Sequence, residues 1–217
     1  MKKYILLFLL PLMALAFTLT SCSESSNDVE EFPDWQQTND TYFDKLYTAT
    51  KAKIDQGDKS WKIIRSWSLE SSAATKPTHH IIAHVISQGT DSIRPFYSDS
   101  VRVHYRGHLI PSTTYKSGYM FDSSYSGDFN EATAVPATFL VSGLINGFTT
   151  ALLNMNLGDH WEVYIPYYLG YGTSDSNSIP GGSTLIFDIN LVGIYRSGVD
   201  VPDWKASANR DGWTMWE

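Results

Sequence analysis

Strict alternation of apolar and polar side chains between residues 101 and 109 is the feature that most constrains the fold. Val101, Val103, Tyr105 and Leu109 share one parity, and Arg102, His104, Arg106 and His108 share the other. Successive side chains of a strand point to opposite faces of a sheet, so the segment predicts an antiparallel strand with one buried face. The four basic side chains could form an anion site. We favour a solvated outer face, because such residues are normally exposed.

In other segments, apolar residues recur with the two-residue period of a strand or with the spacing of a helix. We expect further strands over residues 61–69, 80–87, 160–165 and 185–192. Apolar spacing predicts a helix over 38–54, capped by Thr38 or Asn39 and stopped by Gly57, and a second helix over 148–157, ended by Gly158. Short strands with one central helix indicate an α+β domain, in which a curved antiparallel sheet wraps over a single helix.

The first 21 residues have the layout of a secretory signal peptide. Lys2 and Lys3 precede an apolar run that ends in Leu19-Thr20-Ser21-Cys22. An uncleaved anchor is the alternative. The final four residues resemble the bacterial lipobox, which implies cleavage before Cys22 and lipidation of that cysteine. The acidic stretch over 23–31 indicates a flexible tether. We therefore expect a lipid-anchored envelope protein on the outer membrane, on its periplasmic or its surface side.

Charge and motif content exclude several classes of function. A formal charge of −7 provides no basic footprint for a nucleic acid. A single cysteine permits neither an intramolecular disulfide nor a multi-cysteine zinc site. The chain contains no phosphate-binding glycine loop, HExxH or GxSxG motif, and the histidines lack a metal-ligand spacing such as i,i+4 on a helix. We therefore expect no metal and no cofactor.

Residues 99–194 carry an ordered series of short motifs. In chain order they are Val101-Arg-Val-His-Tyr-Arg-Gly-His-Leu109, Phe121-Asp-Ser-Ser124, Phe139-Leu-Val-Ser-Gly-Leu-Ile-Asn-Gly-Phe148, Ala151-Leu152, Met155, Gly158-Asp159, Ile165-Pro166, Leu169-Gly-Tyr-Gly172, Ile179-Pro180 and Thr184-Leu-Ile-Phe-Asp-Ile189. This series resembles the FKBP-type peptidyl-prolyl cis/trans isomerases, and within them the Mip-like and periplasmic bacterial members. The resemblance implies an FKBP-like fold, a curved antiparallel sheet wrapped over one short α-helix, here with an N-terminal helical extension.

The resemblance also implies roles for nine residues. The catalytic set would be Tyr105, Phe121, Asp122, Ile145 and Tyr171, and the substrate-binding set Leu144, Phe148, Ile179 and Phe187. Asp122 would be a buried carboxylate, the Ile145 backbone N–H a donor to a substrate carbonyl, and Tyr171 a hydroxyl donor. A turn or N-cap role for Asp122 is the alternative from the residues alone.

Three departures from the family pattern stand out. Phe148 replaces the tryptophan of the pocket floor, and Pro136 is followed by Ala137 where an aromatic wall residue is usual. The segment 125–135 is enlarged and lacks the arginine that pairs with the Phe-Asp carboxylate. Binding of macrolide FKBP ligands is therefore expected to be weakened.

Isomerisation of an X-Pro bond needs no nucleophile or metal. Its barrier of about 18–20 kcal/mol arises from amide resonance, and an apolar pocket favours the less polar, twisted transition state. The resemblance implies a peptidyl-prolyl isomerase that acts on proline-containing polypeptides of the envelope. One alternative is a catalytically weak or inactive FKBP-like binding module. Another is an outer-membrane accessory whose Trp-rich extensions bind a partner.

The expected organisation has five parts. They are a lipoprotein signal peptide (1–21), the lipidated Cys22 with its acidic tether (22–36), an N-terminal helical extension (37–60), the FKBP-like isomerase domain (61–196) and a Trp-rich tail (197–217). We expect the tail tryptophans to pack on the N-terminal helix.

Overall fold

One antiparallel sheet organises residues 31–204, the part of the chain that this computed structural model describes. The elements are α1 (Trp35–Asp55), β1 (Trp61–Arg65), β2 (His80–Ser87), β3 (Ser100–Leu109), β4 (Met120–Ser123), β5 (Ala137–Leu140), α2 (Asn146–Leu152), β6 (His160–Ile165) and β7 (Leu185–Tyr195). The strands run in the order β1-β2-β6-β7-β3-β4, and β5 also pairs with β3. Cys22, the signal segment and most of the tail lie outside the described residues.

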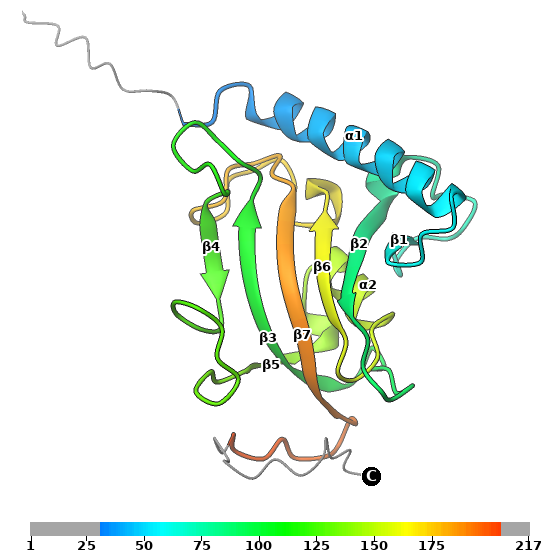
Figure 1. Cartoon of the computed structure of the whole chain (residues 1–217), viewed down its shortest axis with the longest axis vertical. Helices are drawn as coiled ribbons and strands as arrows, with labels where there is room; N and C mark the ends of the chain where they lie inside the picture. Colours follow the sequence, from blue (N-terminus) through cyan, green and yellow to red (C-terminus); the bar gives the residue numbers. More distant parts are fainter. Residues whose placement is uncertain (1–30, 205–217) are drawn as a thin grey trace, which may run out of the picture.

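The sheet is long and curved, with α2 behind it and α1 across one end (Figure 1). Its centre is the pairing of β3 with β7, which runs from Ser100 opposite Tyr195 to Leu109 opposite Leu185. The register shifts in this ladder at Arg102/Val103, and in the β3–β4 ladder at Gly107/His108. Such irregularities increase local twist and so contribute to the curvature.

The inner face of the sheet packs on α2, as the alternation predicts. On β3, Val101, Val103 and Leu109 have no exposed surface and Tyr105 has 7%. Alternate residues of β6 and β7 are buried in the same core cluster with Phe148 and Leu152 of α2. The predicted α+β class, with a curved antiparallel sheet over one short helix, is therefore confirmed.

The central helix ends earlier than its apolar spacing predicts. We expected it to extend over 148–157, but α2 comprises the seven residues Asn146–Leu152. Beyond it, the Asn154 side chain donates to the Thr150 carbonyl and Asp159 accepts from the Asn156 N–H. These bonds compete with helical ones. Met155 is nevertheless fully buried, so the apolar spacing continues beyond the end of the helix.

The first helix begins earlier than expected. It starts at Trp35, so Thr38 and Asn39 lie inside it and cap nothing. Asn39 is instead fully buried. The helix ends before Gly57, which adopts φ +90° as predicted for a stop residue. Within residues 31–204 no helix combines the length and apolar character needed to cross a membrane.

The strand expected over 61–69 ends at Arg65. The Ser66 N–H donates to the His79 carbonyl and Leu69 closes a turn on Ser66. Trp67, which shares the strand parity, is 41% exposed and packs on Tyr97 instead. Parity over the last four residues therefore misled the sequence prediction.

Candidate active site

A cavity of about 220 Å³ lies between the inner face of the sheet and the start of α2. Its lining comes from seven parts of the chain: Tyr105 of β3, Asp122 of β4, Phe139 of β5, the turn Gly143, Leu144 and Ile145, Phe148 of α2, Tyr171 of the following loop, and Phe187 of β7. The β3–β7 pairing brings Tyr105 and Phe187 together, and α2 places Phe148 beneath them.

Four aromatic rings form the walls and floor of the cavity. Phe148 packs edge-on against Phe187, with ring centres 5.0 Å apart, and Phe139 packs edge-on against Tyr105 at 5.5 Å. Phe148 and Phe187 are only 3% and 4% exposed. Edge-to-face packing fixes the orientation of such rings, so the cavity has a rigid apolar interior.

The polar groups of the cavity stand at its rim. The Tyr105 hydroxyl donates to Asp122 at 2.6 Å, and the Ser123 N–H donates to the other oxygen of that carboxylate. Burial, and then the bond to Asp122, raise the pKa of Tyr105, so its hydroxyl stays protonated. Asp122 is exposed. The expectation that it is a buried carboxylate is therefore wrong, because β4 leaves it at the mouth of the cavity.

Two hydrogen-bond donors at the rim have no protein partner within residues 31–204. One is the hydroxyl of Tyr171, a residue that is 45% exposed and whose pKa is raised mainly by burial. The other is the backbone N–H of Ile145, the residue that precedes α2. Both can therefore donate to a ligand that enters the cavity.

The structure brings together seven of the nine predicted site residues. The two others do not line it: Phe121 packs edge-on against Phe187 at 5.4 Å, and Ile179 is 7% exposed within the core cluster. Sequence reasoning missed Phe139 and Gly143. Phe139 lies two residues after Ala137, so the missing wall aromatic is supplied from the next position on the same face of β5.

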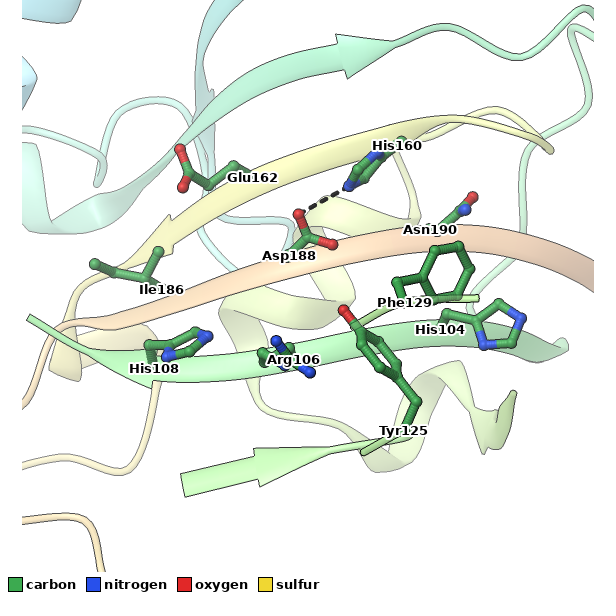
Figure 2. A pocket seen from close by; sticks show the side chains of 10 residues that line it. All are labelled: His104, Arg106, His108, Tyr125, Phe129, His160, Glu162, Ile186, Asp188 and Asn190. Carbon is green, nitrogen blue, oxygen red and sulfur yellow. Dashed lines mark hydrogen bonds and ion pairs between the residues drawn. The ribbon is translucent and has the colours of Figure 1, made fainter. Parts of the chain in front are cut away.

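The outer face of β3 differs from the solvated surface that we expected. Arg102 is 6% exposed and His104 only 1%. The segment after β4 covers part of this face, because Phe129 packs edge-on against His104 and Tyr125 lies over the Arg106 guanidinium at 4.5 Å. Trp204 covers Arg102 and also packs edge-on against His104, so this tail tryptophan lies on β3 and not on the N-terminal helix, where we expected it. Figure 2 shows that His104, Arg106, Tyr125 and Phe129 border a second cavity, of about 380 Å³.

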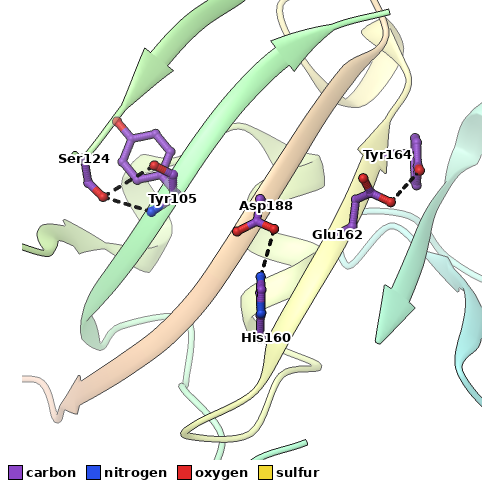
Figure 3. A network of polar contacts seen from close by, with 6 residues as sticks. All are labelled: Tyr105, Ser124, His160, Glu162, Tyr164 and Asp188. Carbon is purple, nitrogen blue, oxygen red and sulfur yellow. Dashed lines mark hydrogen bonds and ion pairs between the residues drawn. The ribbon is translucent and has the colours of Figure 1, made fainter. Parts of the chain in front are cut away.

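Two hydrogen-bonded pairs lie at this second cavity, whereas Arg106 Nε and His108 Nδ1 in its lining are buried without a hydrogen-bond partner in the described part of the chain. His160 pairs with Asp188 at 2.8 Å, and the Tyr164 hydroxyl donates to Glu162 at 2.6 Å (Figure 3). Asp188 and Glu162 stand opposite each other on β7 and β6. Among residues 31–204, no cluster of three or more His, Cys, Asp or Glu side chains has a metal-binding arrangement.

Comparison with known proteins gives one family. Residues 92–192 match the model of the FKBP-type peptidyl-prolyl cis-trans isomerases. The chain is 43% identical over 111 residues to the FKBP-type 22 kDa peptidyl-prolyl cis-trans isomerase of Escherichia coli, covering 51% of this chain and 48% of that protein. It is 40% identical over 114 residues to the outer membrane protein MIP of Legionella longbeachae, covering 52% and 43%.

Among solved structures, FkpA from Escherichia coli matches with a TM-score of 0.48 at 26% identity, covering 75% of this chain and 65% of that one. The chain spans about half the length of the curated relatives that it matches. The family match at 92–192 includes every residue that lines the 220 Å³ cavity.

Proposed function

We propose that this chain, whose residues 92–192 belong to the FKBP-type peptidyl-prolyl cis-trans isomerase family, catalyses rotation about X-Pro bonds of polypeptides. The observation that carries the proposal is the aromatic cavity itself. Residues that lie up to 82 positions apart in sequence converge on it, and each side of the cavity offers what a proline ring and its flanking carbonyls require.

The aromatic rings would bind the pyrrolidine ring. Phe148 forms the floor, and Tyr105, Phe139 and Phe187 form the walls. In the twisted transition state the amide has lost resonance and its carbonyl is less polar than in the planar ground state. An apolar cavity that excludes water therefore binds the transition state more tightly than the ground state, which lowers the barrier.

The rim donors would orient the substrate. We assign the Ile145 N–H and the Tyr171 hydroxyl to carbonyl oxygens of the bound polypeptide, since both face the cavity without another partner. Asp122 holds the Tyr105 hydroxyl and so fixes that wall. Phe121 packs against the Phe187 wall, and Ile179 belongs to the same core cluster as the lining rings. No proton transfer takes part in the reaction.

We also propose an envelope location for the whole protein. The lipobox-like sequence before Cys22 supports cleavage and lipidation there, which would anchor the chain in a membrane. The Legionella longbeachae relative is named as an outer membrane protein, which supports the outer membrane. Polypeptides of the envelope would then be the substrates, and the domain limits given above would separate the anchor, tether, helical extension, isomerase domain and tail.

An isomerisation assay tests the proposed activity. The mature chain with Cys22→Ser is added to a proline tetrapeptide, and the cis-to-trans rate is followed by protease-coupled absorbance. We expect acceleration in proportion to enzyme concentration. Tyr171→Phe removes one hydrogen bond and should lower kcat/KM about two- to tenfold.

The matched control is Tyr168→Phe, which removes a hydroxyl from a 62% exposed ring outside the cavity and should leave the rate unchanged. A folded chain that binds the peptide without accelerating its isomerisation would contradict the proposal and favour a binding module. Weak inhibition by a macrolide FKBP ligand is expected, because Phe148 and Ala137 change the surface on which such a ligand would pack.

A further inference from the structure

The first two turns of α1 form hydrogen bonds to the loop between β6 and β7, which carries Tyr171. The Trp35 indole N–H donates to the Ser183 hydroxyl at 2.7 Å, and the Thr184 N–H donates to the Asn39 side-chain oxygen at 2.7 Å. All four residues are at least 92% buried. These two bonds join segments that are about 145 residues apart in sequence.

Asn39 is an unusual residue at this place. A buried amide inside a helix is unfavourable unless its polar atoms are bonded. Both are bonded here, because the side-chain nitrogen donates to the Trp35 carbonyl at 2.8 Å while the oxygen accepts from Thr184. An apolar residue of the same size would fill the space but would leave the Thr184 N–H without a partner.

The start of α1 also contacts the loop between β6 and β7 at two further places, Gly182 near the end of the loop and Tyr167 near its start. Gly182 adopts φ +79°, and a Cβ atom there would lie 2.8 Å from the Gln36 side chain. The Gln36 amide in turn reaches the Tyr167 hydroxyl at 3.5 Å. The start of α1 therefore contacts both arms of the loop.

Tyr171 lies between these two arms. The Gly182 N–H donates to the Gly172 carbonyl, and the Gly172 N–H donates to the Tyr167 carbonyl, each at 2.9 Å. Gly172 directly follows Tyr171. The connection from α1 to the cavity thus passes through Thr184, Gly182 and Gly172, with hydrogen bonds at each change of segment.

From this geometry we infer that α1 sets the position of Tyr171 in the cavity, with Trp35 and Asn39 as positioning residues. The consequence for catalysis rests on the proposed function, since it assumes that the Tyr171 hydroxyl contacts a substrate carbonyl. The helix α1, which lies outside the family match at 92–192, then affects the isomerisation rate in the cavity that the matched residues form. Later residues of α1 contact other parts of the fold, since Tyr47 packs against His80 of β2 and Lys53 lies over the ring of Trp61 on β1.

The experiment uses the full chain and two substitutions of different severity. Trp35→Phe keeps an aromatic ring and removes one donor, and Asn39→Ala removes both amide bonds. We expect both variants to shift the ring signal of Tyr171 in the NMR spectrum of ¹³C-tyrosine-labelled protein. That signal is identified by its loss in Tyr171→Phe. We also expect kcat/KM to fall about two- to tenfold, up to the loss caused by Tyr171→Phe.

A double-variant cycle separates positioning from stability. In a Tyr171→Phe background, Asn39→Ala should lower the unfolding midpoint as before but should not reduce kcat/KM further. The control is Phe43→Leu, a buried α1 position with no hydrogen bond to the loop. It should lower the midpoint and leave both the Tyr171 signal and kcat/KM unchanged.

Two results would overturn the inference: an unchanged Tyr171 signal in both α1 variants, or an equal loss of kcat/KM with and without the Tyr171 hydroxyl. A wild-type chain without isomerase activity would instead contradict the proposed function. The NMR signal needs no turnover, so it would still decide whether α1 positions Tyr171.

Discussion

At the scale of single residues, the cavity depends on an aromatic ring that the family pattern places elsewhere. Ala137 leaves a gap in the wall, and Phe139 fills it with a ring 5.5 Å from Tyr105 and 6.3 Å from Phe148. Residues 137 and 139 point to the same face of β5. Phe139 therefore supplies a wall ring two positions after Ala137.

Phe139→Leu should lower kcat/KM about two- to tenfold, because an aromatic contact contributes roughly 0.5–1.5 kcal/mol beyond its buried area. The unfolding midpoint should change little, since Phe139 is only partly buried. Leu140→Ala is the control: this neighbour is 52% exposed and points away from the cavity. Equal kinetics for the wild type and Phe139→Leu would remove Phe139 from the substrate contact.

The motif series predicted which residues reach the cavity more reliably than it predicted how deeply each of them is buried. Tyr105, Ile145 and Phe187 reach the cavity as expected. The exposure of Asp122 and the depth of Phe121 and Ile179 could not be read from the sequence. They depend on how far β4 and the loop before β7 overhang the cavity, which distant packing determines.

At the scale of elements, the spacing between α2 and the sheet is set by a glycine. A Cβ atom on Gly147 would lie 2.2 Å from a methyl group of Ile165 on β6. No side chain fits at that distance, so α2 packs against β6 with its backbone close to the strand. Phe148, the next residue, is thereby held at the floor of the cavity.

Gly147→Ala should destabilise the fold by about 1–3 kcal/mol through overpacking. Combining it with Ile165→Ala should cost less than the sum of the two single changes, because the second removes the atoms that the first contacts. Chemical denaturation measures all four chains. Gly143→Ala, where no atom lies within 4 Å, is the control for stability. Additive losses would mean that the contact is relieved elsewhere.

Element types followed from periodicity, but their ends did not. β2 has the predicted limits of 80 and 87, whereas α2 stops five residues before its predicted end at 157. Local side-chain bonds from Asn154 and Asp159 decide that end. Similarly, the strand parity of Trp67 and Leu69 is accidental, because a turn begins at Ser66.

At the scale of the whole molecule, partly buried tyrosine hydroxyls make the stability of the fold decrease at alkaline pH. Burial is the main cause that raises the pKa of Tyr42, Tyr105, Tyr164 and Tyr171. The Asp122 carboxylate adds to it for Tyr105, and the Glu162 carboxylate for Tyr164. The folded chain thus holds these protons at a pH where an unfolded chain releases them.

The free energy of unfolding should therefore fall as pH rises above about 10, the value at which unfolded tyrosines ionise. Below that pH these groups bind equal numbers of protons in both states and add no pH dependence. Urea midpoints at pH 8, 10 and 11 measure the slope. Tyr164→Phe should flatten it, and Tyr168→Phe, at an exposed position, should not. A midpoint that rises with pH would contradict this account.

The arrangement of the sheet over α2 was predictable because alternation and the motif series both specify it. The covering of the outer face was not, since Tyr125 and Phe129 lie in the enlarged segment after β4 and carry no strand or helix period. The packing of α1 on the loop before β7 could not be predicted from the sequence either. It rests on a buried asparagine that sequence reasoning treated as a helix cap.

The central claim is that X-Pro bonds rotate inside the 220 Å³ cavity. NMR exchange spectroscopy on a proline peptide with a small amount of the full chain tests both the reaction and its place. We predict cis–trans exchange peaks that are absent without protein, together with peptide-induced shifts at Tyr105, Ile145 and Tyr171. Exchange peaks without shifts at these residues, or shifts at the cavity with no exchange, would contradict the account.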